Sequence, residues 1–260
     1  MKKVLWVVGM NAGADQAQVL ARAQQMGATA VCVRTDNAAL PAAIPVFHAA
    51  GIGVRGWRWP AVQPGPHGAP HYYALDEAQY LTTVLMPAGL DGYVFDIESD
   101  GPGQVNDWSA AAHQPLAQAF CTQITNAIAA GVPTCAGPFR LGLTAGCQQP
   151  APGNNPNIPW ATFVQSCDAL YPQAYWRASL PGGPKPIHGG TPESSFGKAT
   201  VAWSPIAAGK PLVCMAGELG LITAQEIAAY GEIAANQEEL HFYADLGGAD
   251  ASVLTAISQL

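Results

Sequence analysis

The segment GYVFDIES, residues 92–99, has the composition and pattern of a buried β-strand. Aromatic and β-branched residues favour strands, and successive side chains on a strand point to opposite faces. One face carries only large apolar side chains, those of Tyr93, Phe95 and Ile97. The other face carries Val94, Asp96 and Glu98, so two carboxylates end an otherwise apolar strand.

Seven further apolar runs, each long enough for one strand, lie along the chain. They are VLWVVGM (4–10), TAVCVRT (29–35), GVRGWRWP (53–60), TCAGPFR (134–140), ALYPQAYW (169–176), PLVCMAGEL (211–219) and HFYADLG (241–247). Helical stretches separate them, near 14–27, 37–50, 76–89, 111–130, 191–208, 223–237 and 250–259. Eight strands alternating with helices predict a single (β/α)8 TIM barrel over residues 1–260. An open doubly wound sheet is the alternative, but the count of eight strand–helix units argues against it.

The composition excludes several classes of partner. The 260 residues are 49% apolar and 11% charged, with a net charge of −7. Binding to nucleic acid or to anionic lipid needs a basic surface, so neither is expected. No apolar run approaches the roughly 18 residues of a membrane span. The opening MKKVLWVVGM fits a strand better than a signal peptide. The low charge and a possible disulfide favour an exported or extracellular protein, which would then use a non-classical route. The oligomeric state stays open.

Three polar stretches rich in Gly and Pro each follow a predicted strand: 61–71, 141–159 and 178–190. In a barrel, such loops lie at the C-terminal face, where barrel active sites are built. The Asp96 and Glu98 side chains point into the mouth at this face. Two carboxylates in a confined site repel, so one can stay protonated near neutral pH and act as a general acid. The structural alternative is an Asp that caps the next helix, a role that Asp100 fits better.

Candidate substrate-binding residues lie on three other strands. In YPQAYW (171–176), Tyr171, Gln173 and Tyr175 alternate onto one face and Trp176 follows them. Such polar and aromatic groups suit a sugar, although packing alone could also explain them. The third strand brings Arg55, Trp57 and Trp59 to one face, and tryptophan stacks on sugars and packs cores equally well. The eighth strand brings His241, Tyr243 and Asp245 together. Glu218 ends the seventh strand and faces either the mouth or the helix layer.

The sequence lacks the residues that metal-dependent, thiol-redox and Schiff-base enzymes need. The chain has no CxxC, HxH or HExxH motif and no lysine inside a predicted strand, so no metal or cofactor is expected. Among the six cysteines, Cys147 and Cys167 flank a polar loop and could form a disulfide. The backbone at the glycines near 217–220 and 247–248 could bind a phosphate, but the negative charge of Asp250 would repel it.

Two motifs resemble those of a known family. DGYVFDIE (91–98) resembles the strand-four signature DGxDxDxE of the chitinase-like family 18 glycoside hydrolases. The resemblance implies that Glu98 protonates the glycosidic oxygen and that Asp96 orients the N-acetyl group of the substrate. YPQAYW is similar to the strand-six segment of the same family, which implies that Tyr175, or failing that Tyr171, contacts the acetamido group.

The chain departs from the family 18 pattern at Val94, which stands where the family has its middle acid. The shortened DxE pattern also resembles the lysozyme-like family 25 barrels. Their usual strand-one Asp is missing, since the first strand here holds Trp6 and Met10.

The spacing of the carboxylates favours one mechanism. Residues two apart on a strand have α-carbons about 6.5–7 Å apart. They lie on the same side of a substrate and do not flank the sugar as acid and nucleophile. Attack by the substrate's own acetamido oxygen fits better and predicts a retaining glycosidase for N-acetylhexosamine glycans, such as peptidoglycan or chitin. A non-catalytic carbohydrate-binding barrel and a phosphate-using barrel enzyme are the alternatives.

Overall fold

The computed structural model describes residues 1–11, 13–66, 68–99, 101, 103–180, 182–243 and 249–260. Its main sheet is parallel, with seven strands in the order β6-β5-β4-β3-β2-β1-β9. These strands are β1 (Lys2–Val7), β2 (Ala30–Arg34), β3 (Gly53–Arg58), β4 (Gly92–Asp96), β5 (Arg140–Gly146), β6 (Ala169–Gln173) and β9 (Glu239–Tyr243).

The extended stretch 211–219 closes this sheet into a barrel. The Met215 amide donates to the carbonyl of Pro172 on β6, and the Ala216 amide donates to the carbonyl of His241 on β9, each at 2.8 Å. The stretch also makes isolated parallel bridges to both strands. It therefore takes the seventh of eight positions around the barrel, which confirms the predicted (β/α)8 fold.

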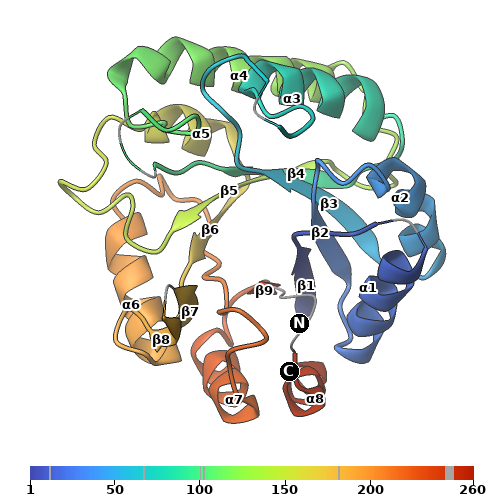
Figure 1. Cartoon of the computed structure of the whole chain (residues 1–260), viewed down its shortest axis with the longest axis vertical. Helices are drawn as coiled ribbons and strands as arrows, with labels where there is room; N and C mark the ends of the chain where they lie inside the picture. The colour runs from blue at the N-terminus through green and yellow to red at the C-terminus, as the bar shows by residue number, and fades with distance from the viewer. Residues whose placement is uncertain (12, 67, 100, 102, 181, 244–248) are drawn as a thin grey trace.

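Helices surround the strands on the outside, as Figure 1 shows. They are α1 (Ala14–Gln25), α2 (Leu40–Ala49), α3 (Ala74–Tyr80) with the π-helical turn η1 (Leu81–Leu85), the short η2 (Ala111–His113), α4 (Gln114–Ala129), α5 (Trp160–Ser166), α6 (Pro192–Trp203), α7 (Ala224–Ile233) and α8 (Ala251–Ser258). Among the described residues, none of these helices is long and apolar enough to cross a bilayer.

The fifth strand was predicted in the wrong place. It spans Arg140–Gly146 rather than 134–140, and the unpredicted helix α5 follows it. The sequence RLGLTAG gives a weak strand signal because of its two glycines. Gly142 is required there, since a Cβ at this position would overlap the ring of Tyr171. The stretch 178–190, predicted as a loop, contains most of an antiparallel hairpin of β7 (Arg177–Leu180) and β8 (Gly183–Pro186).

The barrel has an apolar interior and a separate apolar layer between strands and helices. Val94 packs in the interior with Trp6, Trp57 and Met215. The outer layer includes Tyr93, Phe95 and Ile97, all fully buried. The alternation predicted for the fourth strand is therefore confirmed, and it directs Asp96 toward the interior at the C-terminal end of β4.

The six cysteines are all free. Cys147 packs with Cys214, Ala174 and Ala199, whereas Cys167 belongs to the layer between strands and helices. The Cys147–Cys167 disulfide considered from the sequence is therefore wrong, because the two thiols are buried in different clusters.

Candidate active site

The Asp96 and Glu98 carboxylates meet a single amide at the mouth of the barrel. Gln173, at the end of β6, donates from Nε2 to Asp96 Oδ1 at 3.1 Å and to Glu98 Oε1 at 2.8 Å. An amide NH2 has two hydrogens, so it can make both bonds at once. The bridge holds the two carboxylates side by side with a neutral group.

The two carboxylates differ in their exposure. Asp96 is buried, with 7% of its surface exposed, whereas Glu98 is half-buried. Glu98 lies two residues beyond Asp96, the last residue of β4, and is therefore closer to the solvent on the same side of the strand. An incoming ligand therefore reaches Glu98 first, and Asp96 forms the deeper wall.

Two tyrosines face the carboxylates from neighbouring parts of the mouth. Tyr175, just after β6, and Tyr243, at the end of β9, have ring centroids 5.3 Å apart. Burial raises the pKa of Tyr243 to about 12, and the charges of Asp96 and Glu218 add to this rise. Burial, then Tyr243 and the carboxylates, also raises the pKa of Tyr175 well above its usual value. Both phenols therefore keep their protons at neutral pH and can donate hydrogen bonds.

The tryptophans predicted on the third strand take two different places. Trp57 is 6% exposed inside the barrel and donates from Nε1 to the carbonyl of Val7 at 3.1 Å. It packs against Trp6, with ring centroids 5.6 Å apart, and so forms part of the floor under the mouth. Trp59 is half-buried at the rim, where it lines a cavity with Arg34 and Tyr72.

The structure moves Arg55 and Tyr171 away from the predicted substrate site. Both line a cavity at the N-terminal end of the barrel, opposite the mouth. There Arg55 Nη2 lies 2.8 Å from Glu239 Oε2, and the Tyr171 ring stacks on His241 at 4.2 Å. The strand alternation was predicted correctly, but both residues precede the strand ends that form the mouth. Their assignment to substrate binding at the mouth was therefore wrong.

His241 belongs to the same buried group at the N-terminal end. Trp6 Nε1 donates to His241 Nδ1 at 2.9 Å, so Nδ1 is the unprotonated ring nitrogen. The proton then sits on Nε2, which faces Glu239 Oε2 at 3.6 Å. Burial lowers the pKa of His241, consistent with a neutral ring.

Trp176 is also misplaced by the sequence prediction. It is 1% exposed and packs in the layer under the helices, with its ring 5.9 Å from that of Tyr230 on α7. It follows Tyr175, so alternation directs it away from the mouth. Asp245, with Gly247 and Gly248, lies outside the described residues.

Two more charged residues act at the mouth: Arg34, which the sequence analysis did not consider, and Glu218, whose direction it left open. Arg34 ends β2 on the interior face, two residues after the buried Cys32, and its charge acts on Tyr243. Glu218 accepts a hydrogen bond from the Ser179 amide at 3.3 Å and contributes to the raised pKa of both tyrosines. Alternation from Cys32 would have identified Arg34, whereas Glu218 lies past the regular part of its strand.

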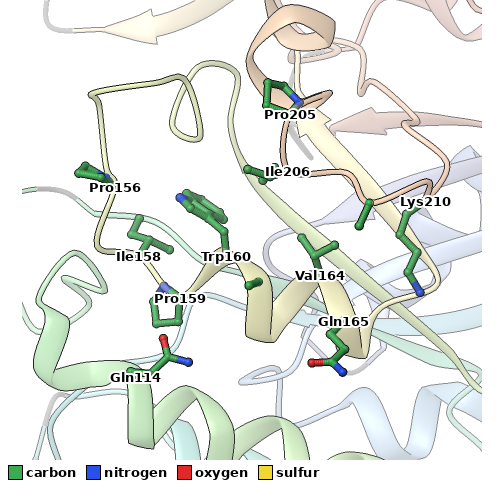
Figure 2. A pocket seen from close by; sticks show the side chains of 12 residues that line it. Gln114, Pro156, Ile158, Pro159, Trp160, Val164, Gln165, Pro205, Ile206 and Lys210 are labelled. Carbon is green, nitrogen blue, oxygen red and sulfur yellow. The ribbon is translucent and has the colours of Figure 1, made fainter.

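A separate apolar cavity of about 650 Å³ lies outside the barrel (Figure 2). Ile158, Trp160 and Val164 line one side, and Pro205, Ile206 and Lys210 come from the segment after α6. No carboxyl side chain lines this cavity in the described part of the chain. It therefore offers no acid and base, unlike the mouth.

The chain is similar in fold to several solved enzymes. A chitinase from Chromobacterium violaceum superposes with a TM-score of 0.65, 12% identity and 98% coverage of each chain. The spore cortex-lytic enzyme of Bacillus cereus gives 0.60 and 8%, covering 98% of this chain and 74% of the other. A family 18 N-acetylglucosaminidase from Paenibacillus barengoltzii gives 0.59 and 11%, covering 100% and 99%.

These similarities establish the barrel fold and no more, because the identities are low and aldolase structures also match. No protein-family model and no curated protein matches the sequence.

Proposed function

We propose that the protein is a retaining glycoside hydrolase that cleaves N-acetylhexosamine glycans, with peptidoglycan or chitin-like polymers as substrates. The observation that carries this proposal is the Asp96–Gln173–Glu98 bridge at the barrel mouth. The similarity to chitinase, N-acetylglucosaminidase and cortex-lytic structures is consistent with it. A cell-wall or extracellular polymer would place its site of action outside the cytoplasm.

The side-by-side arrangement of the carboxylates favours one of two mechanisms. A general acid and an enzymic nucleophile must flank the sugar ring. Asp96 and Glu98 instead share one amide nitrogen and approach a substrate from the same side. The carbonyl oxygen of a 2-acetamido group on the substrate can supply the nucleophile, so the enzyme needs only an acid and a stabilising carboxylate.

The first step then follows from the positions of the groups. Glu98 donates its proton to the glycosidic oxygen as the bond from that oxygen to the anomeric carbon breaks. The acetamido oxygen forms a bond to the same carbon, and positive charge develops on the nitrogen. Asp96 accepts a hydrogen bond from this N–H and stabilises the charge. Tyr175, which keeps its proton, donates a hydrogen bond to the acetamido group.

The second step restores the enzyme. Water attacks the anomeric carbon from the side that the leaving group vacated, and Glu98 takes up one of its protons. The bond to the acetamido oxygen breaks, and the product retains its configuration at the anomeric carbon. Both carboxyl groups end in their starting states.

The direct test is the release of reducing ends from purified peptidoglycan and from N-acetylglucosamine oligomers. We expect the wild type to turn over one of these substrates and Glu98→Gln to lose that turnover. Glu193→Gln, which changes an exposed carboxylate on α6, is the matched control and should keep full activity. Equal turnover by wild type and Glu98→Gln would contradict the proposal.

One observation favours a second function, a carbohydrate-binding barrel without catalysis. Val94 occupies the position of an acid in the family 18 pattern, and it is 1% exposed in the apolar interior. On β4, whose residues are all described, an apolar side chain therefore lies below Asp96 in place of an acid. Binding of N-acetylglucosamine oligomers with no release of reducing ends would support this second function over the first.

A further inference from the structure

A cavity of about 360 Å³ lies between the C-terminal ends of β2 and β3. Aromatic and charged side chains make up most of its lining, namely Arg34, Asp36, Trp57, Arg58, Trp59 and Tyr72. Trp57 is shared with the barrel interior, where it pairs in register with Val94 on β4. The cavity therefore adjoins the mouth next to the strand that carries Asp96.

The cavity carries a net positive charge. Arg34 Nε lies 2.7 Å from Asp36 Oδ1, and Arg58 Nη1 lies 2.6 Å from Asp36 Oδ2. Two guanidinium groups thus share one carboxylate, so the side chains that line the cavity carry one net positive charge. The buried Glu77, which lies outside the lining, also acts on Arg58. The chain as a whole has a net charge of −7, so a positive cavity at the mouth is unusual for it.

Two buried hydrogen-bond donors of this lining have no acceptor among the residues that the structure describes. Arg58 Nε and Trp59 Nε1 are both buried and unpaired. Arg34 contacts Asp36 through Nε, and its side chain is 36% exposed, so it is the more accessible of the two arginines. A ligand that brings acceptors would meet Arg34 first and then reach the two deeper donors.

The same cavity offers flat apolar surface. Trp59 is half-buried at its rim. The Arg58 guanidinium lies 5.1 Å from the centroid of the Tyr72 ring, which fixes both groups against each other. Aromatic rings present an apolar face to the C–H side of a sugar ring, while guanidinium groups bind carboxylates in a planar, paired geometry.

We propose that this cavity is a subsite for a sugar that bears a carboxylate, in a glycan whose cleaved bond lies at Glu98. The inference rests on the proposed function and names the class of glycan. The carboxylate binds Arg34 and Arg58, and the sugar ring lies against Trp59. The carboxylate can belong to a uronic acid or to a lactyl ether on an N-acetylhexosamine, and the ligands of the test distinguish these two sources.

Binding measured by calorimetry tests the subsite independently of turnover. The protein carries Glu98→Gln so that no ligand is consumed. The acidic ligands are a tetrasaccharide of alternating N-acetylglucosamine and N-acetylmuramic acid and one of alternating N-acetylglucosamine and glucuronic acid. The neutral ligands are the same tetrasaccharides with their carboxyl groups reduced to alcohols.

We expect at least one acidic tetrasaccharide to bind about tenfold more tightly than its reduced form, as a charge-assisted hydrogen bond predicts. Arg34→Gln should abolish this preference while leaving the affinity for the reduced form unchanged. The fold should tolerate this change, because Asp36 keeps its contact with Arg58. Lys198→Gln, which removes an exposed positive charge on α6, is the matched control and should keep the preference.

Trp59→Leu distinguishes the contribution of the aromatic surface to binding from the contribution of the positive charge. It should weaken the binding of the acidic and reduced forms equally, because both have the same ring. Equal affinities for the two forms in the parent protein, or an unchanged preference in Arg34→Gln, would overturn the proposal. Failure of the proposed function would instead appear as turnover that survives Glu98→Gln, a separate result.

Discussion

The two ends of the barrel interior hold carboxylates in opposite ways. At the N-terminal end, Glu239 is ion-paired with Arg55 at 2.8 Å and faces the buried His241. At the C-terminal end, Asp96 and Glu98 accept hydrogen bonds from the neutral amide of Gln173. A guanidinium neutralises the charge that it positions, whereas an amide positions a carboxylate without cancelling its charge. The comparison indicates that the N-terminal end stabilises the fold, and it is consistent with the chemistry proposed for the C-terminal end.

Asp96→Asn is expected to have the largest effect. An amide cannot stabilise the positive charge that develops on the substrate, so kcat should fall by about 10²–10³-fold. The free energy of unfolding should change little, since the asparagine can still accept a bond from Gln173. Steady-state kinetics with a labelled oligosaccharide and chemical denaturation would check both parts. A variant that keeps its kcat would contradict the role of Asp96.

Arg55→Met should have the opposite profile. It leaves the Glu239 charge largely buried without its partner, which we expect to lower the free energy of unfolding by about 3 kcal/mol. Turnover per folded molecule should stay within a factor of about two, because Arg55 lies outside the mouth. The double variant with Glu239→Met should regain much of the stability, since it removes the uncompensated charge. An unchanged unfolding midpoint would show that this ion pair does not stabilise the fold.

The pH dependence of stability sharpens the same comparison. Burial alone would raise the pKa of Glu239, but the neighbouring His241 and the charge of Arg55, whose guanidinium lies 2.8 Å from the carboxylate, hold this pKa well below its usual value. A depressed carboxyl pKa stabilises the folded state above the unfolded value of about 4.3, and this contribution is lost as the pH falls toward the folded value.

We therefore expect the wild type to lose about 1–2 kcal/mol more than Arg55→Met between pH 6 and pH 3. Urea denaturation at a series of pH values measures this difference. Parallel pH profiles for the two proteins would show that Arg55 does not depress this pKa.

Tyr175→Phe should have the smallest effect of the series. It removes one hydrogen bond to the acetamido group and keeps the ring that packs against Tyr243, so kcat/KM should fall about tenfold. The same change at Tyr230, a buried residue of α7 whose hydroxyl donates to the carbonyl of Cys214, should alter stability instead. Kinetics on both variants would separate a role in the mouth from a general loss of a hydroxyl.

The sequence predicted the barrel because seven of its eight strand positions have strong apolar runs. The exception is β5, where Gly142 makes room for the ring of Tyr171 and so weakens the local signal. This requirement comes from a residue on a neighbouring strand, which no local pattern reveals. The hairpin of β7 and β8 escaped prediction for a related reason, since its glycines and prolines are typical of loops.

The site was predicted less completely than the fold. Alternation correctly directed Asp96, Gln173 and Trp57 inward, because the period of a strand is local. The position of a residue along the barrel axis depends on the register between neighbouring strands. The sequence of one strand does not reveal this register, so Arg55 and Tyr171 were assigned to the wrong end of the barrel. Which interior residues lie at the mouth cannot be read from one strand alone.

Turnover and unfolding measured side by side for Glu98→Gln and Glu239→Gln test the central claim most directly. Both variants replace a glutamate of the barrel with its amide, at opposite ends. We predict that Glu98→Gln loses turnover and keeps the stability of the wild type, while Glu239→Gln loses about 3 kcal/mol of stability and keeps its turnover per folded molecule. Loss of turnover in both variants, or in neither, would contradict the division of roles between the two ends.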